Sequence, residues 1–225
     1  MFKKSDWLIP TGLIILCVIP MLGGIARISD LFGNGKITPE NARFFTAPSI
    51  VILHIVISCF FGILGALQFS PGFRKRNIHW HKTAGKPLIA SGLISALTGL
   101  WLTYYFPKAE FDGPTLYFVR ILVGVCMSFC ILKAILAIRK RNFKNHGEWM
   151  IRGYALGLGA GTQVLTHLPW LIFTGTIPTG FVRDAAMASG WLINFIAAEW
   201  IIRRGNSIIG KNLIEQNPDT SSIAG

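Results

Sequence analysis

The stretch "PSIVILHIVISCFFGILGALQF", Pro48–Phe69, decides the fold class. Its residues are apolar or small with few exceptions, and it contains one ionisable ring, that of His54. A transmembrane helix needs about 20 predominantly apolar residues to cross a hydrocarbon layer of about 30 Å. The stretch therefore predicts a membrane-spanning helix. His54 needs an explanation, because ionisable groups inside a membrane normally face a partner, a cavity or a pathway.

The rest of the chain repeats this pattern. Of its 225 residues, 52% are hydrophobic and only 14% are charged, whereas soluble domains carry about 25% charged residues. Six segments are long and apolar enough to span a membrane, at about 7–28, 48–69, 87–106, 115–138, 149–174 and 182–202. We expect one all-α, polytopic membrane domain over residues 1–204. The first segment is interpreted as a retained helix rather than a signal peptide, and the polar residues 205–225 predict a disordered tail.

The net charge of +12 is distributed among the connections between these segments. Lys and Arg concentrate at 74–86, 139–144 and 203–211, and the other connections contain fewer of them. Because basic residues accumulate on the cytoplasmic side of membrane proteins, we expect both termini in the cytoplasm and a multi-pass protein of a bacterial inner membrane. Short basic groups between apolar segments also argue against nucleic-acid binding.

Three ionisable residues are expected at one depth near the outer side. At a rise of 1.5 Å per residue, His54 lies about 9 Å, His167 about 10 Å and Arg120 about 8 Å below the outer boundary. Two facing histidines can supply both axial nitrogens of a b-type haem. Arg120 would then neutralise a haem propionate or bind a quinone oxygen. Gln163, one turn before His167, would orient the imidazole or bind the ligand.

A second polar group is expected at the cytoplasmic edge, formed by His79, His81, His146 and Glu148. These side chains are of the types that bind a divalent metal or a second haem. Basic loops rich in Trp and His also occur simply as contacts to lipid head groups. For the outer pair the alternative is similar, since His54 and His167 can hydrogen-bond to each other or to the backbone and only specify packing.

Other polar residues predict structural contacts. Glu199 is expected to form an ion pair with Lys133 or Arg152, which fall at a similar depth. Asn194 is expected to hydrogen-bond across helices. The outer loop contains "TPENARFF", residues 38–45, which can start a short helix; we interpret it as a connector rather than a lid.

Small residues recur at the spacing of close helix contacts. They form two rows, Ser91, Ser95 and Gly99 in the third segment and Gly153, Gly157 and Gly161 in the fifth. Such rows let helix backbones approach closely in lipid. They also leave room for a flat cofactor or for helices of a partner protein.

Three stretches resemble a bacterial and archaeal family of predicted membrane proteins, domain of unknown function 2306. They are "LHIVISCFFGILGALQFSPGFRKRNIHWHKTAGK", "NHGEWMIRGYAL" and "NFIAAEW", and the resemblance extends over roughly Pro48 to Arg204. It implies a multi-helix membrane domain and no established activity. The matched residues that it draws attention to are His54, His81, His146, Trp149 and Arg152.

The leading functional hypothesis is a haem b-binding protein that passes electrons, to or from a quinone or another redox partner. A transporter or lipid-interacting protein without a cofactor is the second hypothesis, and an assembly or scaffold subunit is the third. The sequence contains no phosphate-binding loop and no nucleophile elbow, which argues against an ATP-driven machine or a hydrolase.

Overall fold

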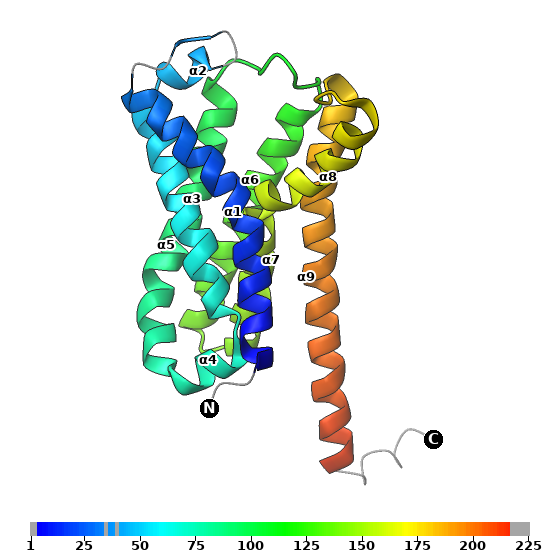
Figure 1. Cartoon of the computed structure of the whole chain (residues 1–225). Coiled ribbons are helices and arrows are strands. Elements are labelled where there is room, and N and C mark those ends of the chain that lie inside the picture. Colours follow the sequence, from blue (N-terminus) through cyan, green and yellow to red (C-terminus); the bar gives the residue numbers. More distant parts are fainter. Residues whose placement is uncertain (1–3, 34–35, 39–40, 217–225) are drawn as a thin grey trace.

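The structure is a computed structural model that describes residues 4–33, 36–38 and 41–216. Its regular structure is helical, apart from one isolated bridge between Asp112 and Gly180. Figure 1 shows long helices running side by side in one bundle. The helices are α1 (Lys4–Phe32), α2 (Ala42–Phe45), α3 (Pro48–Gln68), α4 (Pro71–Arg76), α5 (Ile78–Tyr105), α6 (Leu116–Arg139), α7 (Phe143–Gly157), α8 (Gly159–Thr174) and α9 (Gly180–Gln216). The predicted all-α membrane bundle is confirmed.

Local sequence explains several helix ends. Pro48 and Pro71 stand at the first positions of α3 and α4, where a missing N–H is not needed. The Ser70 hydroxyl accepts a hydrogen bond from the Phe73 N–H and caps α4. Gly175, with φ of 67°, ends α8 in the left-handed conformation that glycine adopts readily.

The helix ends show that the chain crosses the bundle six times. Five helices, α1, α3, α5, α6 and α9, are individually long and apolar enough to span a membrane. Asp184, near the start of α9, bonds to Leu116 at the start of α6, so these two helices begin at the same end. The chain must therefore return from the end of α6 through α7 and α8, which together form the sixth crossing. We call the shared end, where α2 lies, the α2 end, and the opposite one the α4 end (Figure 1).

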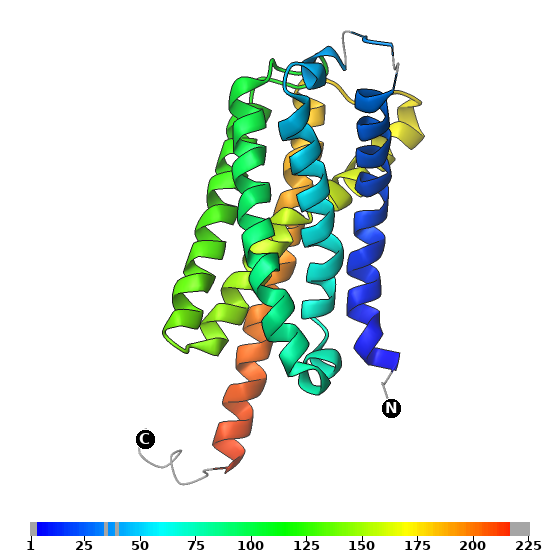
Figure 2. The same cartoon turned by 90° about the vertical axis from the view of Figure 1, so that its left-hand side faces the viewer.

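The fifth predicted segment, 149–174, is divided into two helices. Its first part begins earlier, at Phe143, and the break falls at Leu158. Residues 157–161 read "GLGAG", and glycine is a poor helix former. At the break the Gly161 N–H bonds to the Leu158 carbonyl three residues earlier, at 3.0 Å. The chain consequently changes direction, and α8 runs obliquely across the bundle (Figure 2).

The first segment is a few residues longer than predicted at each end, and two others extend well beyond their predicted bounds. The third begins at Ile78 rather than 87, because the exposed Lys82 and Lys86 keep their charged ends away from the core without ending the helix. The sixth begins at Gly180 and continues to Gln216, through much of the predicted disordered tail, since no proline interrupts it before Pro218. Residues 217–225 of that tail lie outside the described residues.

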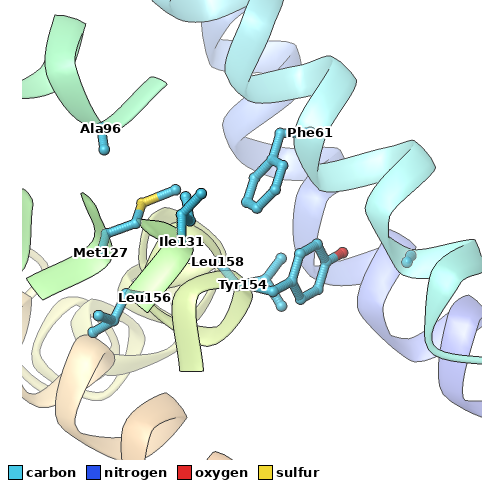
Figure 3. Close-up of a cluster of buried hydrophobic side chains, with 8 residues drawn as sticks. Phe61, Ala96, Met127, Ile131, Tyr154, Leu156 and Leu158 are labelled. Carbon is cyan, nitrogen blue, oxygen red and sulfur yellow. The ribbon is translucent and has the colours of Figure 1, made fainter. Parts of the chain in front are cut away.

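The apolar core joins α3, α5, α6 and α7 (Figure 3). Tyr154 of α7 lies with its ring centroid 5.4 Å from that of Phe61 and 4.7 Å from that of Phe69. Its hydroxyl donates a hydrogen bond to the Gly62 carbonyl at 2.5 Å. The remaining buried members of the cluster are Ala66, Ala96, Met127, Ile131, Leu156 and Leu158.

Glycines of both rows of small residues contact other helices of this bundle. A Cβ at Gly157 would lie 3.0 Å from the Phe61 ring, and a Cβ at Gly161 would overlap the Leu16 carbonyl oxygen of α1. In the other row, Gly99 lies against the His54 ring. These surfaces are therefore occupied by helices of the same chain. The two rows consequently give no support to the scaffold hypothesis.

Candidate functional site

A cavity of about 570 Å³ lies between the helices at the α2 end. This volume is within the range of small-molecule sites, roughly 300–1,000 Å³. Its polar lining consists of Arg43, His54, Ser58, Ser95, Thr103, Lys108, Asp112, Tyr117, Arg120 and Gln163. Its apolar lining includes Ala96, Val123, Met127, Leu156, Met187 and Trp191. Since Met127 and Leu156 also belong to the apolar core, the cavity extends from the end of the bundle down to that core.

His54 is held in the cavity wall by α5. Its Nδ1 lies 2.9 Å from the Thr98 hydroxyl oxygen, which in turn lies 2.7 Å from the Ile94 carbonyl oxygen. The hydroxyl has one hydrogen, and we assign it to the bond with the carbonyl, so that the His54 Nδ1–H donates to Thr98. The Nε2 of a neutral His54 then carries a free lone pair. Metal-binding histidines show this arrangement, in which the second ring nitrogen donates to a protein acceptor.

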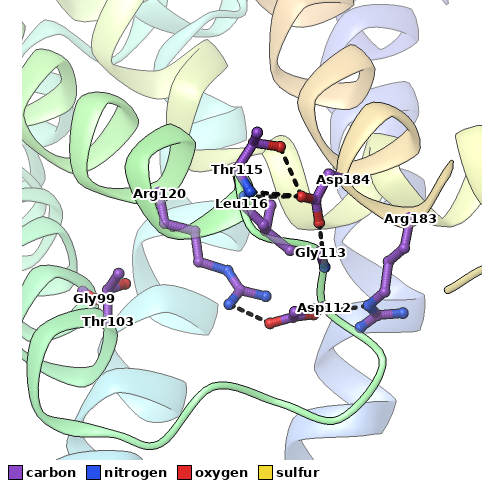
Figure 4. Close-up of polar contacts among 9 residues, drawn as sticks. All are labelled: Gly99, Thr103, Asp112, Gly113, Thr115, Leu116, Arg120, Arg183 and Asp184. Atoms are coloured by element: carbon purple, nitrogen blue, oxygen red, sulfur yellow. Dashed lines mark hydrogen bonds and ion pairs between the residues drawn. The ribbon is translucent and has the colours of Figure 1, made fainter. Parts of the chain in front are cut away.

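Arg120 pairs with a carboxylate of the same chain. Its Nη1 lies 2.6 Å from Asp112 Oδ2, and Arg183 Nε lies 2.8 Å from Asp112 Oδ1. The Asp112 side chain is only 2% exposed. Burial opposes its ionisation, but the hydrogen bonds and charges of Arg183 and Arg120 outweigh burial and hold the Asp112 pKa below its ordinary value. Two helices, α6 and α9, are thus joined through one loop carboxylate (Figure 4).

Asp184 supports the same region by capping α6. Its Oδ1 accepts the Gly113 N–H at 2.7 Å. Its Oδ2 accepts the Thr115 N–H at 2.9 Å, the Thr115 hydroxyl at 2.7 Å and the Leu116 N–H at 3.1 Å. A carboxylate at a helix N-terminus satisfies unpaired N–H groups and is stabilised by the helix dipole. Figure 4 shows Asp184 reaching this turn from α9.

Gln163 and His167 both lie on α8, but their side chains have different surroundings. The Gln163 side chain lines the cavity, and its amide donates to the Met187 carbonyl at 3.1 Å. The His167 Nδ1 lies 2.6 Å from the Gln163 carbonyl oxygen, so it must be the donor. The His167 Nε2 is buried and has no hydrogen-bond partner among the described residues.

The structure thus brings together three of the four predicted outer residues. His54, Arg120 and Gln163 line one cavity, whereas His167 is not among its lining residues. Equal depth along two helices does not determine that their side chains meet. The break at Leu158 directs α8 toward α1 and α9, away from the line that an unbroken helix would follow.

The predicted inner group is only partly assembled at the α4 end. His79 is exposed, and Glu148 accepts a hydrogen bond from Asn206 of α9 at 3.1 Å. The His146 Nδ1 donates to the Ala134 carbonyl at 3.0 Å, and His81 lies within electrostatic range of His146. Within the described part of the chain, no group of three or more His, Cys, Asp or Glu side chains is arranged to hold a metal ion.

Two structural predictions are confirmed near these sites. Glu199 pairs with Arg152 rather than with Lys133, through contacts of 2.5 and 3.1 Å. Asn194 bonds across helices, accepting from the Thr162 hydroxyl at 2.7 Å and donating to the Ala155 carbonyl at 3.1 Å.

Two important site residues were missed from the sequence because they lie outside the predicted spans. Asp112 belongs to the loop before α6, and Arg43 belongs to α2. Comparing residues by membrane depth omits loop residues that fold back over a cavity. The available signal was "TPENARFF", since α2 contributes Arg43 and Phe44 to the cavity lining. The segment expected to be a plain connector thus also contributes two residues to the cavity wall.

A family model for predicted membrane proteins, DUF2306, matches residues 51–202. The chain belongs to this family. Among curated proteins and solved structures, no match to this DUF2306 chain was found. The matched region contains His54, Asp112 and Arg120, whereas Arg43 precedes it. The DUF2306 region therefore forms most of the cavity wall, and the segment before it adds Arg43 and Phe44.

Proposed function

We propose that this DUF2306 protein binds haem b in the cavity and passes electrons within the membrane, with His54 supplying an axial nitrogen. The observation that carries the proposal is the hydrogen bond from His54 Nδ1–H to Thr98. It leaves Nε2 free and restricts the ring orientation, as at known metal-binding histidines. When bound, the haem iron supplies one-electron redox chemistry, and a quinone or another redox partner would exchange the electron.

The rest of the cavity supports this proposal. Its deeper walls are mainly apolar, through residues such as Val123, Met127 and Leu156, and this suits the apolar face of a porphyrin ring. Arg43 and Arg120 line the same cavity and would pair with the propionate groups. Gln163 supplies a side-chain amide beside the ligand.

His167 remains the proposed second axial ligand. Its Nδ1 is also occupied as a donor, which leaves Nε2 with a lone pair. His167 follows the cavity-lining Ala160 by seven residues, or about two turns of the helix. In this structure His167 is not among the residues that line the cavity, so its role as a ligand is the less supported of the two.

The test is the reduced-minus-oxidised optical spectrum of protein purified in mild detergent after expression with haem supplied. A sharp low-spin band is expected in the wild type and should be lost in His54→Ala. Loss in His167→Ala as well would support two histidine ligands. The exposed His79 provides the matched control, since His79→Ala should keep the band. A folded wild-type protein without any haem band would contradict the proposal.

A transporter or lipid-binding protein without a cofactor is the second candidate. It is favoured by the helix break at Leu158, because Gly157 and Ala160 on either side of it line the cavity. Interrupted helices inside membranes occur where they line cavities, and several transporters bind substrates at such points. Solute flux in reconstituted vesicles that is lost in His54→Ala, without any change in the optical spectrum, would favour this candidate.

We also propose that the α2 end faces outward in a bacterial inner membrane. The basic residues concentrate at the α4 end, in the connections α3–α5 and α6–α7 and in α9, as expected for a cytoplasmic side. Labelling of single cysteines with an impermeant reagent tests this: Lys108→Cys should react in intact cells and Lys140→Cys should not.

A further inference from the structure

Cationic groups outnumber carboxylates at the mouth of the cavity. Asp112 is shared by Arg120 and Arg183, at 2.6 and 2.8 Å. The charge of Asp112 also acts favourably on Arg43, which is not among its hydrogen-bonded partners, whereas the charges of Arg120, Arg27 and Arg183 act on Arg43 unfavourably. Asp112 therefore pairs with two guanidinium groups, and Asp30 pairs with Arg27 at 3.4 Å. Arg43 has no ion-paired carboxylate among the described residues.

Two of these guanidinium groups share one aromatic ring. The Arg27 Cζ lies 4.2 Å and the Arg43 Cζ 4.7 Å from the centroid of the Phe44 ring. Each contact is favourable as a cation–π interaction. Together they hold two like charges near each other at the end of the bundle, which is unfavourable unless an anion lies close by. Asp30 is such an anion for Arg27, whereas no carboxylate is ion-paired with Arg43 in the part of the chain that the structure describes.

Arg43 has an unused hydrogen-bond donor. Its Nε is buried and has no hydrogen-bond partner among the described residues. A buried donor without a partner is unusual in proteins and reduces stability. Burial, together with the charges of Arg120, Arg27 and Arg183, outweighs the charge of Asp112 and lowers the Arg43 pKa. An anion bound to this side chain would remove both unfavourable effects.

The surroundings of Arg43 indicate what kind of anion fits. Arg43 and Lys108 approach the cavity from α2 and from the loop before α6, while Arg120 approaches from α6. Below these charges the walls are mainly apolar and continue to Met127 and Leu156 in the core. The Ser58 and Ser95 hydroxyl groups in these walls bond to each other at 2.6 Å. A molecule that fits both parts has an anionic head and an apolar body.

We propose that Arg43, Lys108 and Arg120 bind the oxyanion head of an amphipathic molecule whose apolar part occupies the cavity below. The inference deepens the proposed function and rests on the same cavity, since the carboxylates of haem are one such head. The shared chemistry is a phosphate or carboxylate group. It could belong to an amphipathic molecule or to a free anion, and the two sources are separated by experiment.

The experiment measures binding by calorimetry to the full-length protein, purified without added haem in an uncharged detergent. Hexyl phosphate, inorganic phosphate and the uncharged hexyl glucoside serve as probes. Hexyl phosphate should bind at least about tenfold more tightly than inorganic phosphate, and hexyl glucoside should bind most weakly. Equal affinities for the two phosphates would contradict the amphipathic part of the proposal.

Arg43→Gln is the decisive variant because it removes charge without breaking an ion pair described in the structure. We expect it to weaken hexyl phosphate binding about tenfold, as for loss of a charge-assisted hydrogen bond. Arg139→Gln, which removes an exposed charge at the opposite end, should leave binding unchanged. Lys108→Gln, in an exposed loop, provides a second variant if Arg43→Gln does not fold. Unchanged binding in folded Arg43→Gln, or in Lys108→Gln where only that variant folds, would overturn the proposal.

The outcomes distinguish this site from the haem hypothesis. Binding of hexyl phosphate that depends on Arg43, together with no haem band in folded protein expressed with haem supplied, would support the anion site and contradict the haem hypothesis. A haem band that depends on His54, without any binding of hexyl phosphate, would support the haem hypothesis and contradict the anion site.

Discussion

Arg152 of α7 and Glu199 of α9 form an ion pair with two contacts inside the bundle. Arg152 Nε lies 2.5 Å from Glu199 Oε1, and Nη2 lies 3.1 Å from Oε2. The guanidinium group also lies over the Trp149 ring, 4.8 Å from its centroid. The pair joins α9 to the first half of the broken crossing, below the point where α8 turns away.

Removing one partner of this pair should destabilise the protein. Glu199→Gln leaves a half-buried guanidinium without its counter-charge, and we expect a loss of about 1–3 kcal/mol in the free energy of unfolding. Lys133→Gln is the matched control, because Lys133 is exposed and forms no ion pair among the described residues. Its ammonium group lies near the Phe129 and Trp149 rings. Thermal unfolding in mild detergent provides the measurement. Equal midpoints for the two variants would show that the pair contributes little.

Asp112 should make stability depend on pH in the acidic range. Its pKa in the folded protein lies below the ordinary value of 3.8, so its contribution is complete above that value and is lost as pH falls through the folded pKa. Asp112→Asn should be less stable than the wild type at pH 7, and the difference should shrink below about pH 4. Unfolding midpoints at several pH values test this. The exposed Glu110 offers a control in the same loop, and Glu110→Gln should follow the wild-type profile.

Asp184 should stabilise the start of α6 from a distance. Asp184→Ala removes the acceptor of four hydrogen bonds from residues 113–116. The expected loss is about 1–3 kcal/mol, in the range of capping and charged hydrogen bonds. Hydrogen exchange of the Thr115 and Leu116 amides should accelerate more than that of amides in the middle of α6. Asp184→Asn retains one side-chain oxygen and should fall between alanine and the wild type.

The contact between α1 and α8 should require glycine at position 161. A Cβ there would overlap the Leu16 carbonyl oxygen, which is backbone and cannot rotate away. Gly161→Ala should therefore separate the two helices and lower the unfolding midpoint. At Gly85 of α5 no atom lies within 4 Å of an added Cβ, so Gly85→Ala should be neutral or stabilising by up to about 1 kcal/mol. A Gly161→Ala variant as stable as Gly85→Ala would contradict this contact.

The fold class could be predicted because it depends on properties that each segment carries alone. Length and apolar composition predicted six crossings, including Pro48–Gln68 almost to its observed bounds. An ion pair of Glu199 with Lys133 or Arg152 could also be predicted, since a charged group in a membrane needs a counter-charge. In both cases the physical reason is that the hydrocarbon layer acts on every segment separately.

The tertiary structure alone decided which polar side chains meet. His54 and His167 have similar predicted depths, but the direction of a side chain around a bundle depends on helix order and on the bend at Leu158. Arg43 and Asp112 come from connections, whose positions depend on the helices at both of their ends. The sequence by itself determined that this chain crosses a membrane as helices with histidines inside. The packing of those helices determined that one cavity combines His54 with an excess of guanidinium groups, because its residues come from separate segments.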